Sequence, residues 1–86
     1  MTGEELLRAY RAGERDFRGV KLRSGYIGAA CLHGINLSCA DLQGASMIGV
    51  DLSHANLHRT NFSHTLLVHA NLSNSDLSYA GLTQRH

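Results

Sequence analysis

The chain has 86 residues, of which 43% are hydrophobic, with two cysteines, no proline and a formal net charge of +1 at pH 7. This length holds one small domain, and no hydrophobic stretch is long enough to span a membrane. The near-neutral charge argues against a nucleic-acid-binding protein, whose domains are usually strongly basic. The first five residues lack the basic-then-apolar pattern of a secretory signal, so we expect a cytoplasmic protein.

The N-terminal segment carries the signals of a short helix. Thr2 and Glu5 match the T-x-x-E capping box, and Gly13 is a natural helix terminator. A helix from about residue 3 to residue 12 is therefore predicted. Its apolar residues fall on one face: Leu6, Leu7 and Tyr10. This face needs a partner, and we expect the helix to cover one end of the domain that follows.

From residue 17 onward a large apolar residue returns at every fifth position, fourteen times without a gap. A period of five fits neither an α-helix nor an alternating strand. The position two before each large residue is usually small or β-branched, and a polar residue usually stands between them. Residues two apart in an extended segment point the same way, so both apolar columns can face inward. Each five-residue unit is predicted to form one short extended side and a corner. The fourteen residues are Phe17, Leu22, Ile27, Leu32, Leu37, Leu42, Met47, Leu52, Leu57, Phe62, Leu67, Leu72, Leu77 and Leu82.

Units such as Ala40-Asp41-Leu42-Gln43-Gly44 resemble those of pentapeptide-repeat proteins. The resemblance implies an all-β fold, a right-handed quadrilateral parallel β-helix in which four units form one coil of 20 residues. This chain would hold about three and a half coils. The implied domain organisation is a capping helix over residues 1–14, a β-solenoid over 15–84 and a tail at 85–86.

If residues n and n+20 stack, the outward residues form columns along the solenoid. We expect an ion pair between Lys21 and Asp41, and a cation–π contact between Arg59 and Tyr79. One column should form a polar ladder whose side chains bond along the stack: Asp16, Asn36, Asn56 and Asp76.

The third side of the predicted solenoid is unusual because several of its outward residues are apolar. Contiguous exposed apolar surface usually marks an interaction site, and these residues are our candidate interaction surface. The alternative is a local irregularity near residues 65–68 that turns one of them inward. The candidate residues are Tyr26, Ile48, Leu66 and Val68.

The C-terminal coil is a second candidate surface, with Leu72, Leu77 and Leu82 behind an uncovered backbone edge. Open edges pair with other chains, and two-fold symmetry is the commonest solution. We therefore predict a homodimer formed through this end, which could extend onto the third side. The alternative is that the sequence is a piece of a longer repeat.

Catalytic, cofactor-binding and metal-binding residues are not predicted. The six histidines include no two that are twenty residues apart, and no Cys/His spacing matches a known metal site. A solenoid filled with side chains leaves no pocket, and no phosphate loop is present. Cys31 and Cys39 fall on different sides, so reduced thiols are expected.

Basic residues gather near the N-terminus and form a candidate basic patch: Arg8, Arg11, Arg15, Arg18 and Arg23. We expect them to be a solvated surface of the cap rather than a nucleic-acid site. Some members of the family mimic duplex DNA and bind topoisomerases such as DNA gyrase. That role requires a strongly acidic rod, so it is the alternative hypothesis. The main hypothesis is a non-enzymatic structural or protein-interaction module that associates with itself and with a protein partner the residues do not identify.

Overall fold

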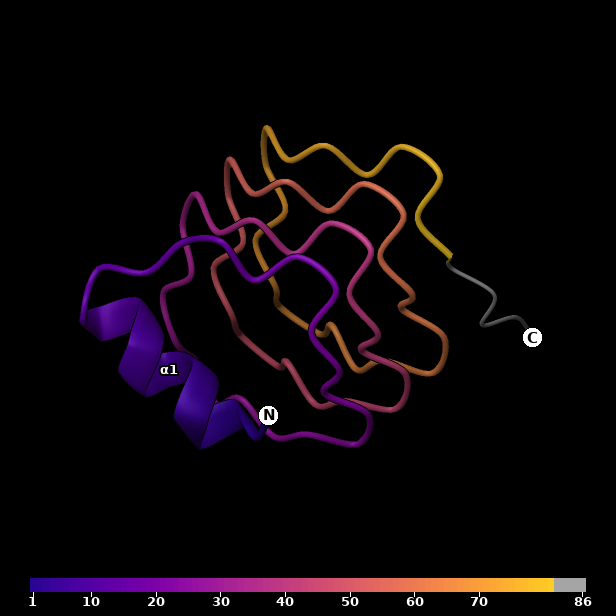
Figure 1. Ribbon diagram of the computed structural model, residues 1–86. Coiled ribbons are helices and arrows are strands. Elements are labelled where there is room, and N and C mark those ends of the chain that lie inside the picture. The colour runs from indigo at the N-terminus through magenta and orange to yellow at the C-terminus, as the bar shows by residue number, and fades with distance from the viewer. Residues whose placement is uncertain (82–86) are drawn as a thin grey trace.

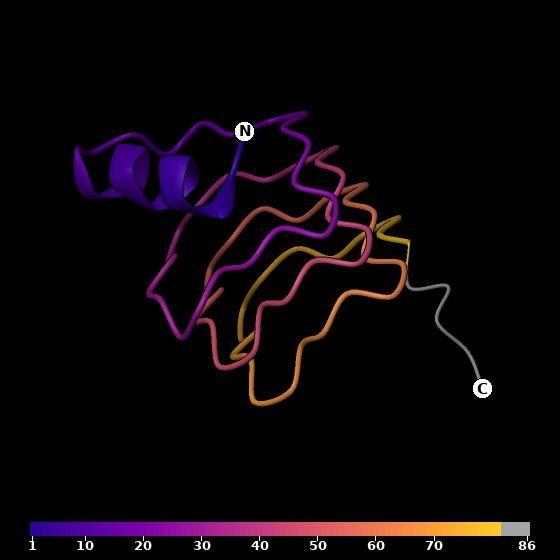
Figure 2. The same ribbon diagram turned by 90° about the horizontal axis from the view of Figure 1, so that it is seen from below.

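In the computed structural model, residues 1–81 are described, and they form one helix followed by a stack of four-sided coils (Figure 1). The chain climbs from the helix at one end to the last coil at the other, as the turned view also shows (Figure 2). Leu82 and the predicted tail lie outside the described residues. Within residues 1–81, no helix is long and apolar enough to cross a membrane.

Helix α1 spans Gly3–Arg11, and its start has the predicted capping box. The Glu5 N–H donates to the Thr2 hydroxyl at 3.1 Å, and the Thr2 N–H donates to the Glu5 carboxylate at 2.8 Å. The helix ends one residue earlier than expected, because Ala12 is the C-cap and Gly13 follows with a φ of 105°. Gly13 supplies a backbone conformation that costs other residues energy.

The solenoid is held by ten parallel bridges, each joining residue n to residue n+20. They run from Asp16↔Asn36 to Asn61↔Gly81, and each side of a coil contributes one bridging residue. The predicted 20-residue register is therefore present, and the chain is a β-solenoid. Because each side is so short, residues 1–81 contain isolated bridges rather than long strands.

Most corners are tight turns closed by a hydrogen bond from the fourth residue to the first. In the corner 17–20, for example, the Val20 N–H donates to the Phe17 carbonyl, and Gly19 has a φ of 71°. A positive φ at the third residue is the mark of a type II turn, which favours glycine. Eight corner residues other than glycine also have a positive φ: Ser24, Cys39, His54, Arg59, His64, His69, Asn74 and Tyr79.

The repeated Asp or Asn of each unit holds the corner that follows it. Its Oδ1 accepts a hydrogen bond from the N–H two residues later, as Asn36 does from Ser38 at 3.0 Å and Asn56 from His58 at 3.1 Å. The predicted polar ladder along the stack is thus wrong for this column, because the side chains bond within their own corners. One bond between coils occurs in the next column, from Asn61 Nδ2 to Asp41 Oδ1 at 3.4 Å.

The core is the stack of large residues of the repeat together with Leu6 of α1. From Phe17 to Phe62 these side chains are at most 3% exposed, whereas Leu67, Leu72 and Leu77 are only half-buried. Two threonines also enter the core. The Thr60 hydroxyl donates to the Leu37 carbonyl at 2.7 Å, and the Thr65 hydroxyl to the Leu42 carbonyl at 2.6 Å. No core hydroxyl is therefore left without a partner in this part of the chain.

Helix α1 covers the N-terminal end of the stack, as predicted (Figure 1). Leu6 is fully buried in the core, and the Tyr10 hydroxyl donates to the His33 carbonyl at 2.7 Å. The Arg15 guanidinium lies 3.6 Å from the centre of the Tyr10 ring and donates to the Tyr10 carbonyl. These contacts join the lid to the first coil.

Candidate functional site

The four apolar residues singled out on the third side all lie exposed, and together they are called the apolar face below. Their exposed fractions are 73% for Tyr26, 45% for Ile48, 49% for Leu66 and 55% for Val68. Tyr26 bridges to Ser46, and Ser46 bridges to Leu66, so one column runs the length of the face. The structure turns none of the four inward.

Two small residues, Gly28 and Ser46, lie among the large side chains of the apolar face. The Tyr26 ring lies over Gly28, because a Cβ placed on Gly28 would be 3.2 Å from the Tyr26 hydroxyl oxygen. Ser46 stands in the column between Tyr26 and Leu66. In the middle coil Ser46 stands beside the exposed Ile48, so every coil of this face presents at least one large apolar side chain.

The third side also carries no formal charge. The segments 24–30, 44–50 and 64–70 contain no Asp, Glu, Lys or Arg. These segments contain no Asn either. The hydrogen bond between an Asp or Asn side chain and the backbone N–H of the following corner, seen on the other sides, therefore has no such acceptor here. A partner that covers this side buries apolar surface without desolvating a charged group, which is otherwise costly.

One corner of the third side departs from the repeat. Among the corners between residues 17 and 80, 27–30 alone lacks the closing hydrogen bond, and Ala29 lacks the positive φ. Helix α1 packs directly on this corner, because a Cβ on Gly3 would lie 2.2 Å from the Tyr26 carbonyl oxygen and 3.2 Å from Ile27. The lid and the apolar face thus share Tyr26.

The candidate basic patch is divided in the structure. Asp16 pairs with Arg18 at 3.0 Å, and Asp41 pairs with Arg23 at 2.6 Å. Arg15 is engaged with Tyr10, while the remaining two arginines, Arg8 and Arg11, stand in the last turn of α1. There they complement the negative end of the helix dipole.

The partner of Asp41 is a correction to the predicted pair. Lys21 is its neighbour in the column, but the hydrogen-bonded partner is Arg23 from the adjacent corner. That hydrogen bond, together with one from the Gln43 backbone, lowers the pKa of Asp41 below 3.8. The Arg18 side chain lowers the pKa of Asp16 in the same way. A guanidinium group stabilises the ionised carboxylate, because its planar N–H donors match the geometry of the carboxylate oxygens.

At the C-terminal coil, Leu72 and Leu77 are half-buried, and Leu82 lies outside the described residues. The N–H groups of Leu72 and Leu77 donate to no backbone carbonyl within residues 1–81. Their equivalents one coil earlier, Leu52 and Leu57, donate to Asn71 and Asp76. Within residues 1–81, this coil therefore leaves these two N–H donors without backbone partners, with half-buried leucine side chains behind them; it is called the C-terminal edge below.

The histidines within residues 1–81 are surface and corner residues, and two pairs of rings form a contact that the columns of twenty did not predict. His33 and His54 have ring centroids 5.0 Å apart, and His58 and Tyr79 have centroids 5.6 Å apart. The two residues of each pair are 21 apart in the sequence. His33 and His58 are the second residues of their corners, and each contacts the third residue of the equivalent corner in the next coil. Arg59 lies over the Tyr79 ring at 5.3 Å, which confirms the predicted cation–π contact.

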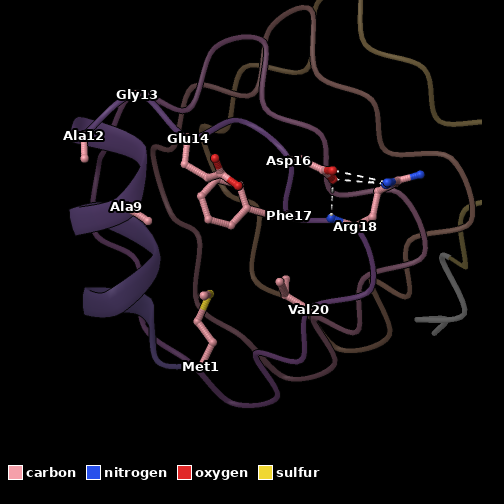
Figure 3. A pocket seen from close by; sticks show the side chains of 9 residues that line it. All are labelled: Met1, Ala9, Ala12, Gly13, Glu14, Asp16, Phe17, Arg18 and Val20. Carbon is pink, nitrogen blue, oxygen red and sulfur yellow. Dashed lines mark hydrogen bonds and ion pairs between the residues drawn. The ribbon is translucent and has the colours of Figure 1, made fainter.

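Two grooves flank α1. The larger, of about 670 Å³, lies between the helix and the first side of the first coil (Figure 3). Met1, Ala9, Phe17 and Val20 line it, and the bonded pair of Asp16 and Arg18 stands at its margin. No three His, Cys or acidic side chains within residues 1–81 are grouped to hold a metal ion. The larger groove offers mainly apolar surface, whereas the second, of about 500 Å³, is lined by Tyr10, Arg11, Arg15 and Cys31 among others.

The square register, the repeated Asp or Asn and the stacked leucines agree with the family comparison. The family model for pentapeptide repeats matches eight copies across residues 35–74 and 55–84. The chain belongs to the pentapeptide-repeat family.

Among solved structures, this pentapeptide-repeat chain is similar to HetL from the cyanobacterium Nostoc sp. strain PCC 7120. The TM-score is 0.90 and the sequence identity 35%, over 93% of this chain. The chain spans only about a third of HetL, 34% of its length. HetL is described as a pentapeptide repeat protein involved in heterocyst differentiation regulation. No curated protein matches this chain.

Proposed function

We propose that this pentapeptide-repeat protein is a non-enzymatic protein-interaction module whose working surface is the apolar face. The observation that carries the proposal is that exposed apolar side chains and a lack of charged residues occur together on one side of the solenoid. Four large apolar residues lie exposed there, on segments without a single formal charge. Apolar surface of this kind is found where proteins meet one another. The regulatory role of HetL is consistent with action through protein contacts.

The proposal is tested by affinity capture from the source cell with wild-type protein and the double variant Leu66→Asp, Val68→Asp. Both residues are about half exposed, so the charges should be tolerated by the fold. Capture of a specific protein by the wild type and its loss with the double variant support the proposal. A matched control, Asn56→Asp, adds a charge to another side and should retain the partner. Equal capture by all three proteins would contradict the proposal.

We further propose self-association in the cytoplasm through the C-terminal edge. Its support is the pair of N–H groups at Leu72 and Leu77 that lack backbone partners within residues 1–81, with half-buried leucine side chains behind them. Pairing with a second copy would satisfy these donors and cover the leucines. A dimer mass in solution at micromolar concentration, with slower amide exchange at Leu72 and Leu77 than at high dilution, is the expected result. A strictly monomeric mass would contradict self-association.

A further inference from the structure

Two histidine rings meet at one corner of the solenoid. His33 and His54 have ring centroids 5.0 Å apart, with 60° between the ring planes. Both residues are exposed, so an ion from solvent can reach them. Imidazole nitrogen is a good ligand for divalent zinc, copper and nickel.

The separation of the rings fits two ligands of one ion. Zinc binds histidine nitrogen at about 2.0–2.1 Å with tetrahedral geometry. Since the centre of an imidazole lies roughly 1 Å behind its nitrogen, two rings on one such ion have centroids roughly 5 Å apart. The observed distance agrees with this value.

A hydrogen bond orients the first of the two rings. His33 Nδ1 lies 3.0 Å from the hydroxyl oxygen of Ser53, within hydrogen-bond distance. Whichever of the two atoms donates, this hydrogen bond occupies the Nδ1 nitrogen of the ring. The other nitrogen, Nε2, is the one left for a metal, as in metal sites whose second nitrogen is hydrogen-bonded.

A second corner has the same histidine–serine hydrogen bond, but there the Nε2 nitrogen is already occupied. His58 Nδ1 lies 2.8 Å from the Ser78 hydroxyl oxygen, and Ser78 donates to Asp76 at 2.6 Å. However, His58 Nε2 accepts a hydrogen bond from Arg59 at 3.2 Å, and the neighbouring ring is Tyr79 instead of an imidazole. This corner is therefore an internal control without a free nitrogen or a second ligand.

We propose that His33 and His54 form a binding site for a divalent transition-metal ion such as Zn²⁺. The two imidazoles are the protein ligands, and water completes the coordination, because no third His, Cys or acidic group joins them within the described part of the chain. An open site with two protein ligands exchanges its ion readily, unlike a closed structural zinc site with four.

The substitutions for the test replace each histidine with the residue that stands 20 positions away in a neighbouring coil. His33→Ser copies Ser53 and Ser73, and His54→Asn copies Asn74, which has the same left-handed backbone with a φ of 58°. His58→Ser copies Ser38 and Ser78 and is the control. Because each new residue already occupies the equivalent position in another coil, all three variants should fold, which circular dichroism verifies.

The experiment is a titration of the full chain with Zn²⁺ by calorimetry, followed by Ni²⁺ broadening of the imidazole NMR signals. We expect His33→Ser and His54→Asn each to weaken Zn²⁺ binding at least tenfold, with His58→Ser unchanged. Ni²⁺ should broaden the His33 and His54 signals before those of His58. Unchanged Zn²⁺ affinity in His54→Asn, absent binding by the wild type, or equal broadening of all histidines would overturn the proposal.

Discussion

Gly3 and the carbonyl of Tyr26 are packed so closely that a methyl group on Gly3 would lie 2.2 Å from the Tyr26 oxygen. This contact joins the first residue of α1 to the first residue of the apolar face. The corner 27–30, which departs from the repeat, lies directly beside this contact. The position of the lid and the shape of the candidate interaction surface are therefore coupled through one residue.

Gly3→Ala should displace the start of α1 and lower the free energy of unfolding by roughly 1–3 kcal/mol, as overpacking does. Urea unfolding measures this loss. Glu4→Ala is the control, because Glu4 is exposed in the same helical turn and should change stability by no more than about 0.5 kcal/mol. Wild-type stability in Gly3→Ala would show that the helix start is not held against Tyr26.

The left-handed corners predict a pair of opposite effects. Gly34 has a φ of 73°, and a Cβ added there would meet no atom within 4 Å. Gly34→Ala should therefore lower the free energy of unfolding by about 1 kcal/mol through backbone strain alone. His64 has a φ of 59°, and His64→Gly should gain up to about 1 kcal/mol by relieving the same strain. Thermal unfolding of both variants provides the comparison. A stabilised Gly34→Ala would be incompatible with these turns.

Thr60 shows how a polar side chain is accommodated in the core. Thr60→Val keeps the shape of the side chain but removes the hydroxyl that donates to the Leu37 carbonyl. The free energy of unfolding should fall by about 1 kcal/mol. Valine fits this position, because Val20 occupies the same column and Val50 the same place in a unit on another side. Urea unfolding tests the loss, and a more stable Thr60→Val would mean that the hydrogen bond contributes nothing.

Acid should weaken the ion pair of Asp41 and Arg23. Because folding lowers the pKa of Asp41 below 3.8, the pair contributes stability above that pH and loses it as the pH falls further. Asp41→Asn keeps an oxygen for the Gln43 N–H but removes the charge, as Asn61 does one coil later. The difference in melting temperature between wild type and Asp41→Asn should be largest near pH 7 and shrink below pH 3.8. A difference that grows with acid would contradict this assignment.

The sequence predicted the register of the solenoid because a period of five over fourteen units leaves few alternatives. It also located the lid through the capping box at Thr2 and Glu5. The residues of the apolar face were found because they break the polar pattern of the outward columns. All of these features depend on spacing along the chain, which can be counted in the sequence.

Contacts between side chains at corners were harder to predict. Columns of twenty placed Lys21 next to Asp41 and separated His33 from His54, yet a corner also brings together residues that are 18 or 21 apart. The signal for these diagonal contacts was present in the sequence as a separation of 21. The irregular corner 27–30 carries no such signal, because its residues Ile27 and Ala30 follow the repeat like those of the regular corners.

The most direct test of the apolar face as the working surface is radical footprinting of the protein in buffer and in lysate of its source cell. We predict that Tyr26, Ile48, Leu66 and Val68 become protected in lysate, while the exposed residues of the charged sides remain equally reactive. Unchanged reactivity of these four residues, with protection confined to another side, would contradict the proposed function.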